Sequence, residues 1–328
     1  MERKLWIDTI RGIGMLAVIF LHTQIYYMGY EFPKGFSQNR MTLFFVVSGY
    51  FFFRSGNIDF RHKLRSMLKG IVIPYFLFMG VLQPVKALYY GDYGSMGNVF
   101  LDILLGKASW FVVALAGAEL LFMLILFISK KKQWAMALCA TLCLVISALL
   151  ERHHLFPHNY WHFKNSLTAV FFLYLGYFYH SRESFFKRFE HRYTLLYISL
   201  LSAILVVLKY IAYQYGWYNY MMTNDMGNYP MFVADSIVGN LLLITLCKHI
   251  PRIRIFTYTG SHSLVYYFFC GAVPVAITAL FNKFIFEYGG HPYRLFLVFA
   301  IVFMVETAIT WAVYQYIPWS IGKKSQKI

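Results

Sequence analysis

The sequence predicts an all-α, polytopic membrane helix bundle of about ten transmembrane helices with both termini in the cytoplasm. Of its 328 residues, 59% are hydrophobic and only 13% are charged, and its mean hydropathy is +0.53. Soluble domains carry about 25% charged residues, which they need for a polar shell. High hydrophobicity also excludes a disordered chain, and four cysteines exclude a disulfide scaffold. The remaining class is a single integral-membrane domain over residues 1–328.

Ten apolar stretches approach the roughly 17–25 residues that a membrane-spanning helix needs. They cover residues 8–27, 41–53, 68–89, 110–129, 134–150, 167–180, 193–213, 231–246, 264–284 and 295–317. The second and sixth stretches are short, so we expect them to tilt, to be re-entrant or to extend into their flanks. Residues 99–105 are too few to cross and predict an interfacial turn of helix.

The distribution of basic residues orients the bundle. With the N-terminus inside, the inner segments hold 20 of the 30 Lys and Arg residues and the outer segments hold 7. An excess of Lys and Arg on cytoplasmic loops is the usual topology signal, and here it favours two inner termini and an even number of spans. Because the basic residues separate apolar segments instead of forming one face, we expect no nucleic-acid partner for the net charge of +16.

Three ionisable residues lie in the first span, where they are costly and indicate function. Asp8 and Arg11 are three residues apart and can pair on one helix face. His22 lies eleven residues after Arg11, on nearly the same face and about 16 Å further along the axis. Taken singly, the first two could be an interfacial pair with a snorkelling arginine, and His22 a packed histidine. Their shared face favours a site.

Basic residues surround the predicted inner mouth of the third span. Arg54 follows the second span, whose Ser48 and Gly49 allow close helix packing. Arg65 and Lys69 are four residues apart on one predicted helix face. Topology and a phosphate-binding site explain these cations about equally well.

Two further residues stand out in the fourth span. Trp110 is placed as an interfacial aromatic would be. Glu119 lies in mid-span without a local cation, so it must pair across helices or stay protonated. Glu306 and Asp235 pose the same question more weakly.

The histidines between the fifth and sixth spans form a weak metal motif. His154, His158 and His162 are spaced by four residues, but Pro157 interrupts the helix that such ligands need. We therefore expect no metal site, and we interpret this segment as a polar, aromatic loop that contacts sugar or lipid headgroups. The cysteines lie in or beside spans and predict packing residues.

The chain resembles the membrane-bound acyltransferase-3 family, in the branch of fucose 4-O-acetylase-like and enterobacterial-common-antigen-type O-acetyltransferases. The first-span segment WIDTIRGIGMLAVIFLH, with Arg11 and His22 separated by ten residues, is the most specific part of the resemblance. Weaker matches follow over about the whole chain: FFVVSGYFF from Phe44, LRSMLKGIVIPY from Leu64, SWFVVALAGAELLF from Ser109 and GSHSLVYYFFC from Gly260.

The resemblance implies an O-acyltransferase of the cell membrane that moves an acyl group, expected to be acetyl, from acyl-CoA to a sugar hydroxyl of a cell-surface or lipid-linked glycan. Acetyl-CoA would be a donor substrate, and no cofactor would be permanently bound. His22 would be the general base, and Asp8 and Arg11 would orient the donor or stabilise charge. Arg54, Arg65 and Lys69 would bind the CoA phosphates, and Trp110 and Glu119 would be further substrate-binding residues.

Other readings of the sequence stay open. The competing function is a membrane exporter or flippase of a glycan or glycolipid, which intramembrane charges would also suit. The sequence also leaves open whether the chain forms a homo-oligomer.

Overall fold

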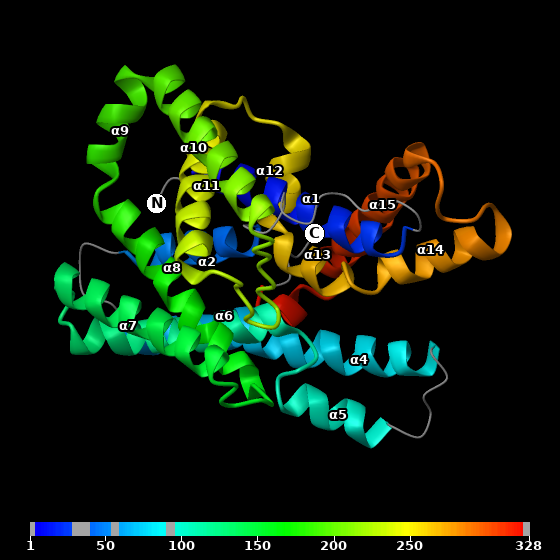
Figure 1. The fold of residues 1–328 in the computed structure, drawn as a ribbon. Coiled ribbons are helices and arrows are strands. Elements are labelled where there is room, and N and C mark those ends of the chain that lie inside the picture. The colour runs from blue at the N-terminus through cyan, green and yellow to red at the C-terminus, as the bar shows by residue number, and fades with distance from the viewer. Residues whose placement is uncertain (1–3, 28–39, 54–58, 90–95, 324–328) are drawn as a thin grey trace. The chain divides into compact units, whose positions relative to one another are not determined.

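The structure is a computed structural model that describes residues 4–27, 40–53, 59–89 and 96–323 (Figure 1). Within these ranges every named element is helical, apart from one isolated bridge between Tyr220 and Asp225. The chain divides into two compact units, each assembled from segments that are distant in sequence. Unit 1 comprises residues 1–34, 73–103 and 252–328, and unit 2 comprises residues 35–72 and 104–251. Each unit is described by itself.

Unit 1 joins the first helix of the chain to the last ones. Its helices are α1 (Leu5–Ile25), α4 (Ile73–Tyr89), α5 (Met96–Leu104, which ends one residue past the unit), α12 (Arg254–Ser261), α13 (Ser263–Phe269), α14 (Val273–Phe284), α15 (Pro292–Tyr316) and the 3₁₀ turn η4 (Pro318–Ile321). Helices α13 and α14 meet at a bend of 48°. Pro274 in the first turn of α14 explains why a new helix starts there.

Two glycines let α1 and α12 cross at backbone contact. A Cβ atom on Gly12 would collide with the backbone carbonyl of Phe256, and one on Gly260 would collide with the carbonyl of Asp8. Small residues at such crossings are the main device by which membrane helices approach closely. The crossing holds the turn of α1 that carries Asp8 and Arg11 against α12.

Unit 2 is built around a central helix, α8. Its elements are α2 (Arg40–Phe52), α3 (Phe60–Met67), the π-helix η1 (Leu68–Val72), α6 (Trp110–Ile128), α7 (Gln133–Arg152), the 3₁₀ turn η3 (Tyr160–His162), α8 (Phe163–Ser181), α9 (Glu183–Arg192), α10 (Thr194–Gln214) and α11 (Tyr229–His249). Most side chains of α8 are buried, against α2, α6 and α7. The crossing of α2 and α8 again uses glycines, because Cβ atoms on Gly49 and Gly176 would collide with the carbonyls of Leu173 and Val46.

Among the described residues, seven helices are long and apolar enough to cross a membrane, or eight if the bent pair of α13 and α14 is one span. All ten predicted stretches lie on helices, but α2 has only 13 residues and α8 does not pass the test of length and apolar composition. The polar first turn of α8 explains this: Lys164, Asn165 and Ser166 are buried in unit 2, so the helix need not be apolar. The count of ten and the orientation of the termini stay predictions.

The third predicted span begins earlier than the sequence indicates. The helix runs continuously from Phe60 to Tyr89, and residues Leu68–Val72 have π-helical geometry. A π-helical turn has one more residue than an α-helical turn and occurs frequently at functional sites. Lys69 lies within this turn, and Arg65 lies about one turn before it, in α3.

Candidate functional site

The first-span residues lie in unit 1, where α1 contacts α12, α13, α14 and α15. Asp8 is buried in the first turn of α1, next to the crossing with α12. Arg11 is partly buried one turn later and donates a hydrogen bond from Nη2 to Ser263 Oγ at 2.9 Å. Asp8 and the Tyr314 side chain lie near the Arg11 guanidinium. The arginine side chain thus contacts α13 and lies near α15.

A histidine that sequence analysis left without a role lies beside this arginine. His262, which joins α12 to α13, is positioned by contacts of its Nδ1 with the Tyr258 carbonyl at 2.7 Å and with Ser261 Oγ at 2.9 Å. Its ring lies 4.1 Å from the Tyr314 ring. His262 and Ser263 both belong to the segment GSHSLVYYFFC, so the motif itself was the available signal.

His22 lies in the last turn of α1, half-buried. Around it, α1 is anchored by aromatic side chains: Phe20 contacts the rings of Phe296 at 6.0 Å and Phe299 at 5.4 Å. The Tyr288 hydroxyl also donates to the carbonyl of Thr23 at 3.0 Å. The end of α1 that carries His22 is therefore held against the first half of α15.

Glu306 is the second residue whose importance the sequence understates. Its side chain is 0% exposed, and among the described residues neither carboxyl oxygen has a hydrogen-bond partner. On α15, Glu306 lies between Phe299 and Tyr314. The Phe299 ring contacts Phe20, and Tyr314 lies near Arg11. A buried carboxyl group without a partner is costly, which makes Glu306 a functional candidate.

Glu119, in unit 2, is paired across helices as its mid-span position requires. Its carboxylate accepts a hydrogen bond from Ser48 Oγ of α2 at 2.5 Å and forms an ion pair with Lys63 Nζ of α3 at 3.6 Å. Lys63 also lies 3.9 Å from the centroid of the Phe52 ring, a cation–π distance. Sequence analysis found no cation for Glu119, because Lys63 belongs to another helix, α3.

The other residues predicted to bind substrate are placed differently. Arg65 and Lys69 are exposed, and Trp110 begins α6 with its ring edge against Phe111 at 5.8 Å. Arg54 lies outside the described residues. Asp235 forms an ion pair with Lys209 at 2.7 Å, which gives this intramembrane acid a structural partner.

Within the described ranges, no three His, Cys, Asp or Glu side chains lie close enough together to hold a metal ion. Pro157 and several left-handed residues keep the segment between α7 and α8 from forming the helix on which His154, His158 and His162 would align.

Asp8, Arg11 and His22 thus belong to unit 1, which also contains Ser263, His262 and Glu306. The predicted substrate-binding residues Arg65, Lys69, Trp110 and Glu119 belong to unit 2.

Comparison with known proteins gives one finding at the level of the family. No curated protein and no solved structure matches the chain. The family model of the acyltransferase domain matches residues 4–315, which is nearly the whole chain and both of its units. Together with the apolar helices this indicates a multi-pass membrane protein. The chain belongs to the acyltransferase-3 family.

Proposed function

We propose that the protein transfers an acyl group, in the first place acetyl, from acyl-CoA to a sugar hydroxyl of a cell-surface or lipid-linked glycan at the plasma membrane. The proposal rests on the polar face of α1, in a chain that belongs to an acyltransferase family. On that face, Arg11 is fixed on Ser263, and the imidazole of His22 lies about three turns beyond it.

Acyl transfer from a thioester to an alcohol sets clear chemical demands. A base must take the proton of the hydroxyl, and a positive or hydrogen-bonding group must stabilise the oxyanion that forms at the carbonyl. We assign the first role to His22, because a neutral imidazole is a competent base near neutral pH. The sugar oxygen then attacks the acyl carbonyl, the C–S bond breaks, and the CoA thiolate recovers the proton from His22.

Arg11 and Asp8 supply charge near this face. A guanidinium held by Ser263 is suited to orient the donor or to stabilise negative charge. Asp8 is buried one turn before Arg11 on the same helix. Glu306 is buried nearby on α15 without a hydrogen-bond partner among the described residues, and it is a second group that could hold a transferable proton.

Donor binding in this proposal uses the basic residues of α3 and η1. Arg65 and Lys69 are exposed, as residues that meet CoA phosphates must be. Replacing both with Gln should weaken donor binding, with the larger effect at low salt because phosphate contacts at the surface are screened by ions. Unchanged donor affinity in the double variant would leave these two residues a role in topology alone.

The decisive experiment measures consumption of labelled acetyl-CoA by the purified protein in lipid with candidate glycans. His22→Gln keeps the volume and one hydrogen bond but cannot accept a proton at neutral pH, so turnover should fall about 10²–10⁴-fold. The matched control His249→Gln changes an exposed histidine of α11 and should leave turnover intact. Near-normal turnover of His22→Gln would make His22 structural. A parent protein that never consumes acyl-CoA would favour export of a glycan instead.

A further inference from the structure

The connection between α7 and α8 has an unusually strained backbone. Within residues 154–162, five residues that are not glycine have positive φ values: His154, Phe156, Asn159, Trp161 and His162. The left-handed region is unfavourable for side chains with a Cβ atom. Such residues persist only where the surrounding structure holds them, and they concentrate at functional sites.

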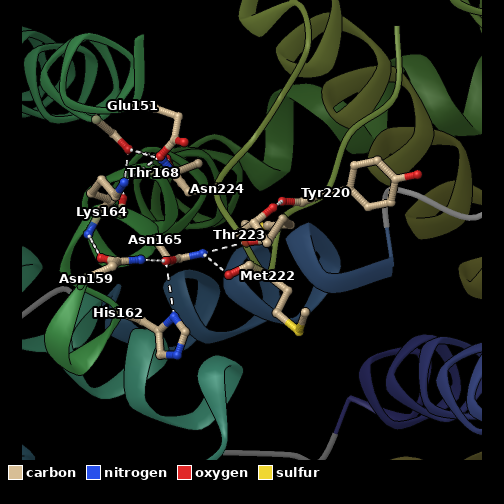
Figure 2. A network of polar contacts seen from close by, with 12 residues as sticks. Glu151, Asn159, His162, Lys164, Asn165, Thr168, Tyr220, Met222, Thr223 and Asn224 are labelled. Carbon is tan, nitrogen blue, oxygen red and sulfur yellow. Dashed lines mark hydrogen bonds and ion pairs between the residues drawn. The ribbon is translucent and has the colours of Figure 1, made fainter. Parts of the chain in front are cut away.

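A buried polar network holds this connection in place (Figure 2). At its centre, Asn165 Nδ2 donates to the Met222 carbonyl at 3.2 Å, and Asn165 Oδ1 accepts from Asn159 Nδ2 at 2.8 Å. Asn159 Oδ1 accepts in turn from the Lys164 backbone N–H at 3.0 Å. The Lys164 ammonium forms an ion pair with Glu151 at 2.6 Å. These links join the strained connection to α8, and they join α8 to α7 and to the segment before α11.

The segment between α10 and α11 belongs to the same network of hydrogen bonds. Asn224, itself left-handed and fully buried, donates to Ser147 Oγ and to Tyr229 Oη, both at 2.9 Å. It also accepts from Thr168 Oγ1 at 3.0 Å, as Figure 2 shows. The two connections therefore form one preorganised surface.

The strained connection presents aromatic rings to the outside. Phe156 is 64%, Tyr160 46% and Trp161 39% exposed, and the His158 ring stacks on Tyr160 at 5.4 Å and 15°. The Trp161 backbone N–H donates to the Leu105 carbonyl at 2.9 Å. This bond ties the backbone of Trp161 to the connection between α5 and α6. We call these four residues the aromatic platform.

Positive charge surrounds the aromatic platform. The Lys107 ammonium lies 5.6 Å from the centroid of the Tyr160 ring, and Arg152, the last residue of α7, is exposed. Glu151, the acidic residue at this end of α7, is already paired with Lys164. The platform thus combines exposed ring faces with two exposed basic side chains.

Anchoring to the bilayer interface does not require this construction. An aromatic ring can lie at the membrane interface from a regular helix: Trp134 lies in the first turn of α7, where it is 69% exposed. A strained backbone lowers the free energy of unfolding, and anchoring to the bilayer would not offset this cost. Binding of a ligand would offset it, because a surface that is already ordered pays no ordering cost when the ligand binds.

We propose that the aromatic platform binds an acidic saccharide. Its ring faces contact the C–H faces of a pyranose, and Lys107 and Arg152 meet a carboxylate or phosphate group of the same glycan. The inference rests on the proposed function, for which the platform supplies an acceptor-binding subsite.

The test measures saccharide binding without any acyl donor. Saturation-transfer NMR on the protein in nanodiscs would compare short soluble oligosaccharides that carry uronate, sialate or phosphate groups with their neutral counterparts. We expect the acidic compounds to bind at least about tenfold more tightly. Tyr160→Leu and the double variant Lys107→Gln/Arg152→Gln should each weaken binding about tenfold or more. Tyr160 is not among the left-handed residues, so its replacement adds no backbone strain.

Matched controls change the same residue types at the other end of α7. Trp134→Leu and Lys130→Gln should leave saccharide binding unchanged. Absence of binding of every acidic compound at about 10 mM, or equal weakening by the control variants, would overturn the proposal. So would a fluorophore at Tyr160→Cys that brominated lipids quench as strongly as one at Trp134→Cys, because the platform would then be an interfacial belt.

The outcomes separate this inference from the proposed function. If acyl-CoA is consumed but no saccharide binds, only the subsite is wrong. If an acidic saccharide binds and acyl-CoA is never consumed, the platform stands and the transferase assignment is wrong.

Discussion

Glu306 and Glu119 show how differently two intramembrane carboxyl groups can be accommodated. Glu119 is stabilised by Ser48 and Lys63 from two other helices, so its burial has a structural explanation. Glu306 has no hydrogen-bond partner for either oxygen among the described residues. Residues that lower stability and are nevertheless present commonly serve activity, because active sites trade stability for function.

The Glu306→Gln variant separates these two cases by measuring stability and turnover together. The amide keeps the shape of the side chain and carries no charge, so the midpoint of thermal unfolding should be unchanged or higher. Acetyl-CoA turnover should fall by about 10²-fold or more if Glu306 holds a proton that moves during transfer. Full turnover in a protein of unchanged stability would show that this carboxyl group has no part in the reaction.

The two units use the same device at the level of their helices. Gly12 and Gly260 permit the crossing of α1 and α12, and Gly49 and Gly176 permit the crossing of α2 and α8. In each crossing the missing side chain faces a backbone carbonyl, which cannot move aside as a flexible side chain can. Both crossings position helices of the candidate site, α1 in unit 1 and α2 with its Ser48 in unit 2.

Adding one methyl group at these crossings should be strongly destabilising. Gly176→Ala and Gly260→Ala force two backbones apart, and overpacking of this kind costs about 1–3 kcal/mol or more. Gly80→Ala in α4 is the control, since nothing lies within 4 Å of its Cβ position. That control should be neutral or stabilise the helix by about 0.5–1 kcal/mol. Unfolding midpoints of the purified variants in one detergent test the difference, and equal midpoints would contradict the backbone contacts.

The connection between α7 and α8 should respond to acid through His162. Burial lowers the pKa of His162, an effect that its contact with Asn165 at 3.3 Å only partly offsets. The unfolded state therefore binds the proton more readily, with a pKa of about 6.5. The stability that neutral His162 contributes is fully present above that value and is lost as the pH falls through the lowered folded-state pKa.

Hydrogen exchange of the residues 154–168, corrected for intrinsic exchange rates, measures this response. Protection should fall between about pH 7.5 and pH 5, and a His162→Gln variant should lose most of that pH dependence. Protection that rises on acidification, or that falls equally in the variant, would show that another group controls this connection.

Sequence patterns predicted the helices of the whole molecule better than their roles. Apolar stretches locate every predicted span on a helix, because hydropathy is a local property. The partners of Arg11 and Glu119 come from segments 252 and 71 residues away, and no local pattern contains such contacts. The π-helix at Lys69 and the left-handed run before α8 likewise arise from tertiary packing, which overrides helix periodicity.

The topology of the whole chain is the prediction that all functional assignments depend on. The charge asymmetry places the turn between α6 and α7 and the helix α9 on the cytoplasmic side, and the segment between α10 and α11 outside. Two exposed residues test this with a membrane-impermeant thiol reagent after the native cysteines are replaced. Met222→Cys, in the latter segment and 57% exposed, should label in intact cells. Lys187→Cys, in α9 with its side chain 62% exposed, should label only after the membrane is opened. The reverse pattern would put the acyl-CoA site on a side of the membrane without acyl-CoA, and the proposed direction of acyl transfer would then be wrong.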